Sequence, residues 1–468
     1  MCALATGDRS GSRCPWRRVR TRSRCARASL AGRALRGDHR RNQANRPCAC
    51  RASERARQRS LTFARHHRDG EVVTVRRVKF FDTTLRDGEQ APGNAMDPAA
   101  KVQLALAIEG LGVDRIETGF PASSASDYEA THLISRQLVK AEFTSFCRAV
   151  PSDITTAVSA GGTARHQIQI AATGSDIHLE HKRRISRAEG IREVIGCIEH
   201  ARSLGISNVS VGIEDASRGP DSLLRELAER SVDAGAHTLV VADTAGALLP
   251  GEYGHLISRF RSWVPQSVMI ATHCHEDLGL STANALAGIL AGADEVQVTL
   301  GGVGERAGNT ALEEIAALLA YKQEATGLYS DVNLERMYEV YTLLRDLISL
   351  DEPRNKAIFG TYAFSTAAGM HQQGMLRNPA TYEFVQPSHF GRERGMFIGR
   401  HSGTGVLRRL LSELQIEVDD HALQDLYRSH IVNRKGDCED MSVVKARLAS
   451  EFGSATPSPT SITQSGIR

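Results

Sequence analysis

From residue 78 to about residue 320, short apolar runs alternate with segments in which apolar residues recur at i, i+3 and i+4. The short runs predict buried strands, and the wider spacing predicts helices with one apolar face. The expected strands are 78–82, 115–119, 143–148, 167–172, 208–213, 238–242, 268–273 and 295–300. Helices are expected between them, among others at 99–111, 188–204, 221–235, 254–263 and 281–291.

Eight alternations of strand and helix within about 240 residues match the repeat of a (β/α)8 TIM barrel. An open, doubly wound sheet is the alternative, although such sheets more often have fewer strands. Beyond the barrel, helical patterns continue at 333–350, 405–414 and 421–432. We therefore predict an α/β protein with a catalytic TIM barrel at 75–325 and a mainly helical C-terminal subdomain at 326–452.

Residues 1–74 lack this periodicity and are rich in Arg, Ala, Ser and Gly, so this head is predicted to be disordered. An organelle transit peptide, a basic nucleic-acid arm and a start assigned too early all explain such a composition. The regular pattern begins abruptly at Val75, which favours the last of the three. The tail at 453–468 is rich in Ser, Thr and Pro and is expected to be flexible.

The charge of the chain is unevenly distributed. Residues 1–70 contain 19 of the 58 basic residues, all arginine, and 4 of the 54 acidic ones, which leaves 39 basic and 50 acidic residues elsewhere. The chain beyond residue 70 is therefore net acidic, which argues against a nucleic-acid partner. No apolar run is long enough for a membrane span. The four cysteines beyond the head form no disulfide framework, which favours a reducing cytoplasm. These cysteines are Cys147, Cys197, Cys274 and Cys438.

His273 and His275 end the seventh expected strand. Side chains at i and i+2 of a strand point to the same side, so the two imidazoles are directed at one point. This is a metal-ligand geometry that suits zinc, manganese, iron and similar ions. Cys274 points the opposite way and is expected to be a small apolar filler.

Polar residues fall at the C-terminal ends of all eight expected strands, where TIM barrels carry their active sites. Capping of the following helix explains some of them, but capping does not require a polar group at every end. The residues at the first seven ends are Asp82, Arg86, Asp87, Glu89, Glu117, Arg148, Thr173, Asp176, His178, Glu214, Asp215, Arg218, Asp243, Thr244, His273, His275 and Asp277, and the eighth end leads into the glycine-rich loop 301–309.

Three motifs, FDTTLRDGEQ at 81–90, HCHEDLG at 273–279 and GVGERAGN at 302–309, together resemble the isopropylmalate synthase and homocitrate synthase family. The GMH sequence at 369–371, Tyr382 and the HSG sequence at 401–403 also resemble it, so the resemblance covers roughly 76–435. These enzymes condense the methyl carbon of acetyl-CoA onto the keto carbon of a 2-oxo acid and then hydrolyse the thioester. The resemblance implies the same acyltransferase reaction for this chain.

The resemblance also implies a divalent metal ion, with Mn, Mg, Zn and Co as candidates. Its ligands would be Asp87, His273, His275 and Asn309. One carboxylate, two imidazoles and an amide carbonyl suit these ions better than a thiolate-seeking ion, so the residue types agree with the implied set.

Catalytic roles follow from the same resemblance. Arg86 would stabilise the oxyanion that forms on the keto group, because its guanidinium presents a fixed fork of donors. His371, supported by Glu214 and Tyr382, would take the proton from the thioester methyl. In the family this segment reaches the active site of the neighbouring subunit, so a homodimer is implied.

Substrate contacts are predicted on three further strand ends and on the glycine-rich loop. Thr244 resembles the family's threonine that binds the 2-oxo acid carboxylate, and Arg148 and His178 are assigned to the rest of the substrate. The loop with Gly302 and Gly304 is expected to contact coenzyme A, since it opens onto a helix expected from residue 310 whose free amides could take a phosphate.

The chain departs from isopropylmalate synthases after the His401 motif, where only about 60 residues follow in place of a regulatory domain. Leucine feedback is therefore not expected. The short form resembles homocitrate synthases and relatives that use phosphinopyruvate or phosphonopyruvate, so 2-oxoglutarate and phosphinopyruvate are preferred to 2-oxoisovalerate as substrates. Arg183 and Arg184 either suit such an anionic substrate or are solvated surface charges.

Two rival enzyme classes share part of this pattern. A lyase of the hydroxymethylglutaryl-CoA lyase type would have the same barrel and His-x-His site, but the motif at 302–309 and the His371 region argue against it. Iron oxygenases with two histidines and one carboxylate usually have an all-β scaffold, which the alternation of strands and helices does not match. We therefore predict the condensing enzyme.

A chain that begins near Val75 is expected to keep full condensing activity, because the arginine-rich head contributes no periodic element to the predicted barrel. Release of free CoA by the full and the shortened chain tests this. A large loss of activity would show that the head is functional. A salt-dependent affinity for RNA that disappears with residues 1–74 would support a nucleic-acid role instead.

Overall fold

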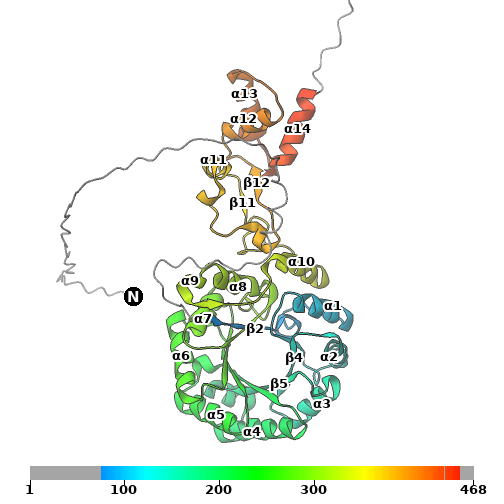
Figure 1. Cartoon of the computed structure of the whole chain (residues 1–468), viewed down its shortest axis with the longest axis vertical. Helices are drawn as coiled ribbons and strands as arrows, with labels where there is room; N and C mark the ends of the chain where they lie inside the picture. Colours follow the sequence, from blue (N-terminus) through cyan, green and yellow to red (C-terminus); the bar gives the residue numbers. More distant parts are fainter. Residues whose placement is uncertain (1–74, 437, 454–468) are drawn as a thin grey trace, which may run out of the picture. The chain divides into compact units, whose positions relative to one another are not determined.

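The structure is a computed structural model that describes residues 75–436 and 438–453, so the predictions for the head at 1–74 and for the tail beyond 453 lie outside the described residues. Eight parallel strands form a closed barrel in chain order (Figure 1). Each expected strand is present within two residues of its predicted bounds. The strands are β2 (Lys79–Asp82), β3 (Arg115–Gly119), β4 (Glu142–Arg148), β5 (His166–Thr173), β6 (Asn208–Glu214), β7 (Thr238–Asp243), β8 (Met269–Cys274) and β9 (Glu295–Val298).

Helices surround the barrel, which explains why strands such as β3 and β7 are buried at every position. Side chains on one face of each strand fill the barrel interior, and those on the other face pack against the helices. None of the helices in the described ranges combines the length and apolar character that a membrane crossing needs. The surrounding helices are α1 (Pro98–Glu109), α2 (Ala125–Gln137), α3 (Pro151–Gly161), α4 (Arg187–Ser203), α5 (Asp221–Asp233), α6 (Pro250–Trp263), α7 (Ser281–Leu290) and α8 (Leu312–Tyr321).

Side-chain caps define where several of these helices begin. Asp97 accepts a hydrogen bond from the backbone N–H of Ala100 at the start of α1, and Ser124 caps α2 in the same way. A reciprocal pair of bonds between Ser186 and Glu189 starts α4. Because all eight barrel strands run parallel, the residues at their C-terminal ends gather on one rim of the barrel.

The segment after α8 returns to the barrel wall. It comprises α9 (Gln323–Thr326), β10 (Leu328–Tyr329), which pairs with β1 (Arg76–Arg77), and α10 (Met337–Ile348), which packs against α1. Tyr341 of α10 stacks on Phe359 with ring centroids 4.3 Å apart. The predicted helix at 333–350 is thus confirmed as α10, preceded by a single helical turn at Leu334–Arg336.

The rest of the C-terminal extension has a core of its own, in which Leu407, Leu410, Ile431 and Leu448 are buried together. The prediction of a mainly helical extension is confirmed, but a small three-stranded sheet was not foreseen, because strands this short carry no readable periodicity. The helices are α11 (Gly369–Arg377), α12 (Thr404–Glu413), α13 (Asp420–Tyr427) and α14 (Met441–Gly453), and the strands are β11 (Ser365–Thr366), β12 (Gly395–Ile398) and β13 (Glu439–Asp440).

Candidate active site

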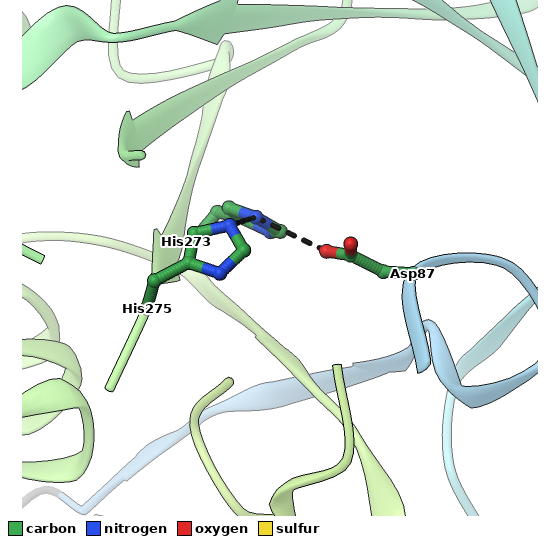
Figure 2. A group of neighbouring side chains, drawn as sticks. All are labelled: Asp87, His273 and His275. Atoms are coloured by element: carbon green, nitrogen blue, oxygen red, sulfur yellow. Dashed lines mark hydrogen bonds and ion pairs between the residues drawn. The ribbon is translucent and has the colours of Figure 1, made fainter. Parts of the chain in front are cut away.

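Asp87, His273 and His275 meet at the rim where β2 and β8 end. Asp87 lies in a short helical turn after β2, His273 belongs to β8, and His275 follows it. The Nε2 atom of His273 lies 3.3 Å from Asp87 Oδ2 and 3.2 Å from His275 Nε2. One potential ligand atom from each of the three residues lies within 4.8 Å of the other two (Figure 2). Cys274 faces away and is buried in the hydrophobic core.

The charge state of these three side chains suits a cation. Burial lowers the pKa of His273 to about 4, although Asp87 acts in the opposite direction, and burial also lowers the pKa of His275. Burial alone would raise the pKa of Asp87, but Arg86 and the two histidines bring this pKa down to about 2. At neutral pH the site therefore offers two uncharged imidazoles with free lone pairs and one ionised carboxylate.

Asn309 lies beside this cluster. Its Nδ2 atom donates to Asp87 Oδ2 at 2.8 Å, and its backbone forms a bridge with that of His275. The buried Oδ1 atom of Asn309 and the buried Nδ1 atom of His275 have no hydrogen-bond partner among the described residues. An unsatisfied amide oxygen next to two imidazoles and a carboxylate is a mixed donor set that fits a divalent ion such as Zn, Mn, Co or Mg.

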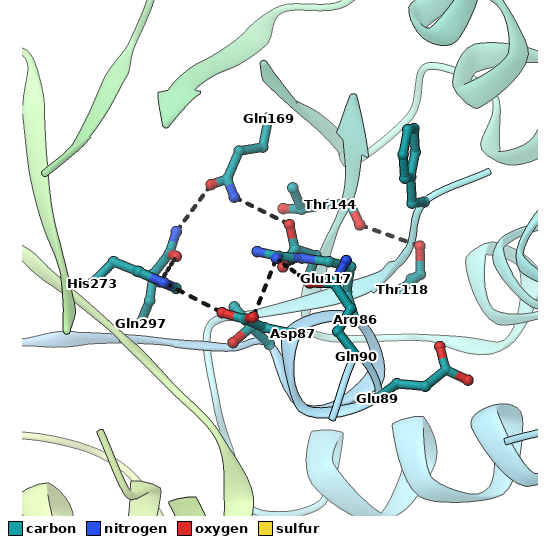
Figure 3. Close-up of polar contacts among 12 residues, drawn as sticks. Arg86, Asp87, Glu89, Gln90, Glu117, Thr118, Thr144, Gln169, His273 and Gln297 are labelled. Atoms are coloured by element: carbon teal, nitrogen blue, oxygen red, sulfur yellow. Dashed lines mark hydrogen bonds and ion pairs between the residues drawn. The ribbon is translucent and has the colours of Figure 1, made fainter. Parts of the chain in front are cut away.

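Arg86 is almost buried beside Asp87. Its Nε atom donates to Glu117 Oε2 at 2.7 Å, and its Nη1 atom lies 3.5 Å from Asp87 Oδ1 (Figure 3). Its guanidinium lies 4.6 Å from the ring centroid of Phe146. Burial raises the pKa of Glu117 to about 7, while Arg86 acts against that shift. Together the carboxylates and the aromatic ring fix the plane of the guanidinium.

A cavity of about 640 Å³ has Arg86, Asp87, His273 and His275 in its wall. The structure thus brings three of the four predicted metal ligands and the predicted oxyanion donor to one space. Three other predicted site residues, Arg148, Glu214 and Thr244, also line it. The apolar part of the wall consists of Phe146, Ala149, Val150, Ala171, Gly212, Val240 and Ala242.

Three cationic side chains in the cavity wall each have an acidic partner. Because these carboxylates already neutralise the cations, a second anion gains less from binding to them. Arg184, which was predicted together with Arg183, is not among the residues that line the cavity. The ion pairs are Arg148 with Asp153 at 2.8 Å, Lys182 with Glu214 at 2.6 Å and Arg183 with Glu193 at 2.5 Å.

Thr244 follows the end of β7 and presents a hydroxyl to the cavity. Its Oγ1 atom accepts a hydrogen bond from the backbone N–H of Asp215 at 2.8 Å, so the hydroxyl hydrogen remains free to donate. Arg306 donates to the carbonyl oxygen of Thr244 at 2.6 Å and to the carboxylate of Asp277. These bonds hold the glycine-rich loop against the end of β7.

Three of the predicted catalytic and substrate-binding residues do not line this cavity in the described chain. His178 lies behind the wall, where its Nδ1 atom is 3.7 Å from Glu214 Oε1 and its Nε2 atom is 3.7 Å from Asp215 Oδ2. His371 and Tyr382 lie in the extension, where both are exposed. Their ring centroids are 4.4 Å apart. The two predicted proton-transfer residues therefore contact each other but not the cavity wall.

Gly302 and Gly304 shape the loop that carries Asn309 but do not line the cavity. The φ angle of Gly302 is +69°, which disfavours residues with a side chain. A Cβ atom on Gly304 would lie 2.7 Å from Asn309 Oδ1. These glycines therefore allow the loop to approach Asn309 closely, and their assignment to coenzyme A stays a prediction.

The helix after this loop, α8, begins at Leu312, so the expected start at Thr310 is wrong. The backbone N–H of Thr310 donates to the carbonyl of Cys274 instead of remaining free. The first turn of α8 contains Glu313 and Glu314, and the carboxylate of Glu313 accepts from the backbone N–H of Gly301 at 3.0 Å. Because two acidic side chains already lie at this helix N-terminus, it offers a phosphate no favourable site.

Several polar residues of this region were not predicted from the sequence as site residues, among them Gln169, Gln297, Lys182 and Arg306. Gln169 of β5 and Gln297 of β9 line the cavity and are buried inside the barrel. Glutamine at an inward position of a strand that is otherwise apolar was the available signal. Lys182 and Arg306 also line the cavity, and each belongs to a segment already singled out, at 178–184 and 302–309.

Asp82 provides a pH-dependent contribution to stability. It is fully buried and accepts bonds from the backbone N–H and the hydroxyl of Thr84, both at 3.0 Å. Burial raises its pKa from 3.8 to about 7. The folded state therefore holds this proton more tightly than the unfolded state does, and the free energy of unfolding falls as pH rises from about 4 to 7.

Asp82→Asn is expected to remove about one proton from this pH dependence, because a single titrating group is deleted. Urea unfolding at pH 5 and pH 8 measures it, and the variant should lose less stability between the two pH values than the wild type. Asp233→Asn, an exposed change on α5, is the control. An unchanged pH dependence in Asp82→Asn would show that its carboxyl is not the titrating group.

Comparison with known proteins agrees with this fold and site. Residues 77–344 match the HMGL-like family, and residues 358–434 match the homocitrate synthase post-HMGL domain-like family. The chain is 38% identical over 360 residues to the putative (R)-citramalate synthase CimA of Methanopyrus kandleri, covering 77% of this chain and 69% of that protein. It is 40% identical over 358 residues to the 2-isopropylmalate synthase of Sediminispirochaeta smaragdinae, covering 75% and 71%.

Among solved structures, hydroxymethylglutaryl-CoA lyase from Pseudomonas aeruginosa is similar to this chain with a TM-score of 0.52. The match covers 65% of this chain and 99% of the lyase at 18% sequence identity, so it concerns the fold alone. The closed barrel and its cluster of two histidines and a carboxylate define a TIM-barrel enzyme of the HMGL-like class. Within that class, the chain belongs to the isopropylmalate synthase and homocitrate synthase family of acyltransferases.

Proposed function

We propose that the protein condenses acetyl-CoA with a 2-oxo acid and hydrolyses the thioester, releasing free CoA and a 2-hydroxy dicarboxylic acid. The observation that carries this proposal is the position of Arg86 beside Asp87, His273 and His275 in the wall of one cavity. The names of the relatives, 2-isopropylmalate synthase and (R)-citramalate synthase, support the reaction class. The alternative, a lyase of the hydroxymethylglutaryl-CoA type, is supported by likeness of fold only.

Four residues would hold a divalent ion, with Mn, Mg, Zn and Co as candidates, and when bound this ion polarises the keto group of the 2-oxo acid. They are Asp87, His273, His275 and Asn309. Arg86 would donate hydrogen bonds to the oxyanion that develops on the keto oxygen. Because its guanidinium is already fixed in the folded protein, little reorganisation is needed as the charge develops.

The carboxylate of the 2-oxo acid would bind to the hydroxyl of Thr244. This hydroxyl accepts from the backbone N–H of Asp215, so its own hydrogen is free to bond to an acceptor in the cavity. Arg306 supports the arrangement through its bond to the carbonyl oxygen of Thr244. The distal part of the substrate would extend toward Arg148 and the segment that contains His178, as the sequence predicts.

Proton removal from the acetyl methyl group needs a base, and we assign this role to His371 with support from Tyr382 and Glu214. The rings of His371 and Tyr382 are in contact, and both residues are exposed in the extension. The cavity of the same chain contains Glu214 but neither ring. A second copy of the chain would supply the two rings to this cavity, so the functional unit is a homodimer.

A mixture of two inactive variants, His275→Ala and His371→Ala, is expected to regain activity. In a mixed dimer one site combines an intact metal cluster with an intact His371 from the other chain, whereas the second site lacks both. After complete exchange of subunits the mixture should reach about a quarter of wild-type thiol release. Each variant alone, which forms only dimers of two identical chains, provides the control. Absence of any recovery after verified exchange would contradict a site shared between subunits.

We propose that the preferred 2-oxo acid has a short apolar side chain. Alkyl side chains such as Val150, Ala171 and Val240 make up much of the cavity wall, and they offer no partner to a buried distal charge. Arg183 lines the cavity but is paired with Glu193. On this ground we prefer a 2-oxo acid with a short apolar side chain to the 2-oxoglutarate and phosphinopyruvate that the sequence favours.

The proposal is tested by following thiol release from acetyl-CoA with pyruvate, 2-oxoisovalerate, 2-oxoglutarate, oxaloacetate and phosphinopyruvate in turn. Pyruvate or 2-oxoisovalerate should give a kcat/KM about tenfold or more above that of the dianionic acids, because the latter must displace carboxylates already paired with Lys182 and Arg183. A preference for 2-oxoglutarate or phosphinopyruvate would contradict the apolar substrate. Failure of every 2-oxo acid would overturn the proposed reaction.

A further inference from the structure

A chain of buried amides crosses the barrel interior and joins His273 to Arg86. His273 Nδ1 lies 2.9 Å from Gln297 Oε1, Gln297 Nε2 donates to Gln169 Oε1 at 2.9 Å, and Gln169 Nε2 donates to Glu117 Oε1 at 3.1 Å (Figure 3). The second oxygen of Glu117 accepts from Arg86 at 2.7 Å. Gln169, Gln297 and Glu117 are at most 3% exposed, so water does not compete for these bonds.

The chemistry of one end of this chain determines the direction of every bond in it. Burial raises the pKa of Glu117 to about 7, so at pH 8 the carboxylate paired with Arg86 has no hydrogen to donate, and Gln169 must face it with its NH2 group. Gln169 then faces Gln297 with its oxygen, and Gln297 has only its own oxygen left for His273. The proton of His273 therefore lies on Nδ1, and the free lone pair lies on Nε2.

The selected nitrogen is the one that faces the candidate metal site. His273 Nε2 lies 3.3 Å from Asp87 Oδ2 and 3.2 Å from His275 Nε2. With the other tautomer, this nitrogen would carry a hydrogen and could not bind a cation. Asp87 also lies 3.5 Å from Arg86, so the amides complete a closed ring of polar contacts through His273, Gln297, Gln169, Glu117, Arg86 and Asp87.

We propose that Gln169 and Gln297 are positioning residues that hold His273 in the tautomer with Nε2 free for a metal ion and tie this choice to the ion pair of Arg86 with Glu117. The inference rests on the proposed function, because it assigns a metal ion to this site. Partners of this kind, which bond to a ligand and not to the ion, typically change metal affinity by about 10- to 100-fold when they are lost.

In a purely structural role, the two glutamine side chains would only fill the interior of the barrel and would not affect the metal site. Gln167 offers a matched comparison, because it is the same residue type on the same strand and is 1% exposed. It accepts from Thr144 Oγ1 and donates to Asn208 Oδ1, both at 3.0 Å, and neither of these partners belongs to the site. Gln167→Leu therefore removes a buried amide without interrupting the chain to His273.

The first measurement is the Kd of Mn²⁺ alone by calorimetry at pH 8, without substrate. Gln297→Leu and Gln169→Leu are each expected to weaken Mn²⁺ binding by about 10- to 100-fold, and Gln167→Leu is expected to leave it near the wild-type value. Gln169→Leu is the informative variant. It leaves Gln297 in place, but the side-chain amide of Gln297 is then free to flip and to face His273 with its NH2 group. Wild-type affinity in Gln169→Leu, or an equal loss in Gln167→Leu, would overturn the proposal.

The second measurement is the tautomer of His273 at pH 8 by ¹⁵N NMR of histidine-labelled, metal-free protein, with the signal assigned by a His273→Asn variant. The wild type should show hydrogen on Nδ1, and Gln169→Leu should show both tautomers. Hydrogen on Nε2 in the wild type would overturn the proposal even if the variants fail to fold. If both measurements agree with the proposal but no 2-oxo acid gives thiol release, the reaction class fails while the positioning role stands.

Discussion

His275→Ala is expected to abolish the release of free CoA from acetyl-CoA and a 2-oxo acid, with a loss of more than about 10³-fold in kcat/KM. The variant removes one of the two imidazoles that face Asp87, and with it a lone pair that the candidate metal ion needs. Because the side chain of His275 has no hydrogen bond within residues 75–436 and 438–453 other than its contact with His273, the fold should be retained. Thiol release, bound metal content and the thermal midpoint are measured together.

The control for this variant is His255→Ala, which removes an exposed imidazole from α6. It should keep both activity and metal content. Full turnover by His275→Ala would remove the metal assignment, and with it the site for condensation. Loss of activity together with a large fall in the thermal midpoint would mean that His275 acts through stability, which its position at the edge of the cavity does not predict.

Arg86→Lys is expected to lower kcat by about 10²- to 10³-fold, as the loss of a fixed oxyanion donor does in other enzymes. An ammonium group keeps the charge but cannot reproduce the fork that contacts Glu117 and Asp87 while facing the cavity. Steady-state kinetics on the best 2-oxo acid measures the effect. If Arg86→Lys keeps wild-type kcat, a point charge suffices and the oriented guanidinium has no catalytic role.

Arg86→Met separates the catalytic from the structural contribution of the same side chain. It leaves the Glu117 carboxyl buried without its ion-pair partner, which should cost roughly 3–5 kcal/mol of stability at pH 8. Adding Glu117→Gln removes the unpaired charge, so the double variant should recover part of that stability but none of the activity. Urea unfolding and thiol release measure the two effects. Parallel recovery of activity and stability would contradict the role of Arg86 at the oxyanion.

Local sequence pattern determined the barrel. The eight strands and the helices between them follow from apolar periodicity, because each strand must bury both faces and each helix one face. The sequence also predicts that the two histidines of the metal cluster point to the same side, since side chains at i and i+2 of a strand do so. Asp87 and Asn309 were predicted as ligands from the motifs that contain them. Their closeness to His273 arises from the closed barrel, in which the first and last strands pair.

The tertiary structure alone decided which partners these residues have. The bond between Gln169 and Gln297 spans 128 positions of the chain, and no local period predicts it. The ion pair that neutralises Arg183 likewise depends on how its short helical turn lies against α4. Residue type and spacing thus determined which groups reach the rim of the barrel. Hydrogen-bond direction, charge pairing and the choice of tautomer arise only when closure of the barrel brings side-chain atoms of distant strands within about 3 Å of each other. These interactions depend on distance in space and not along the chain.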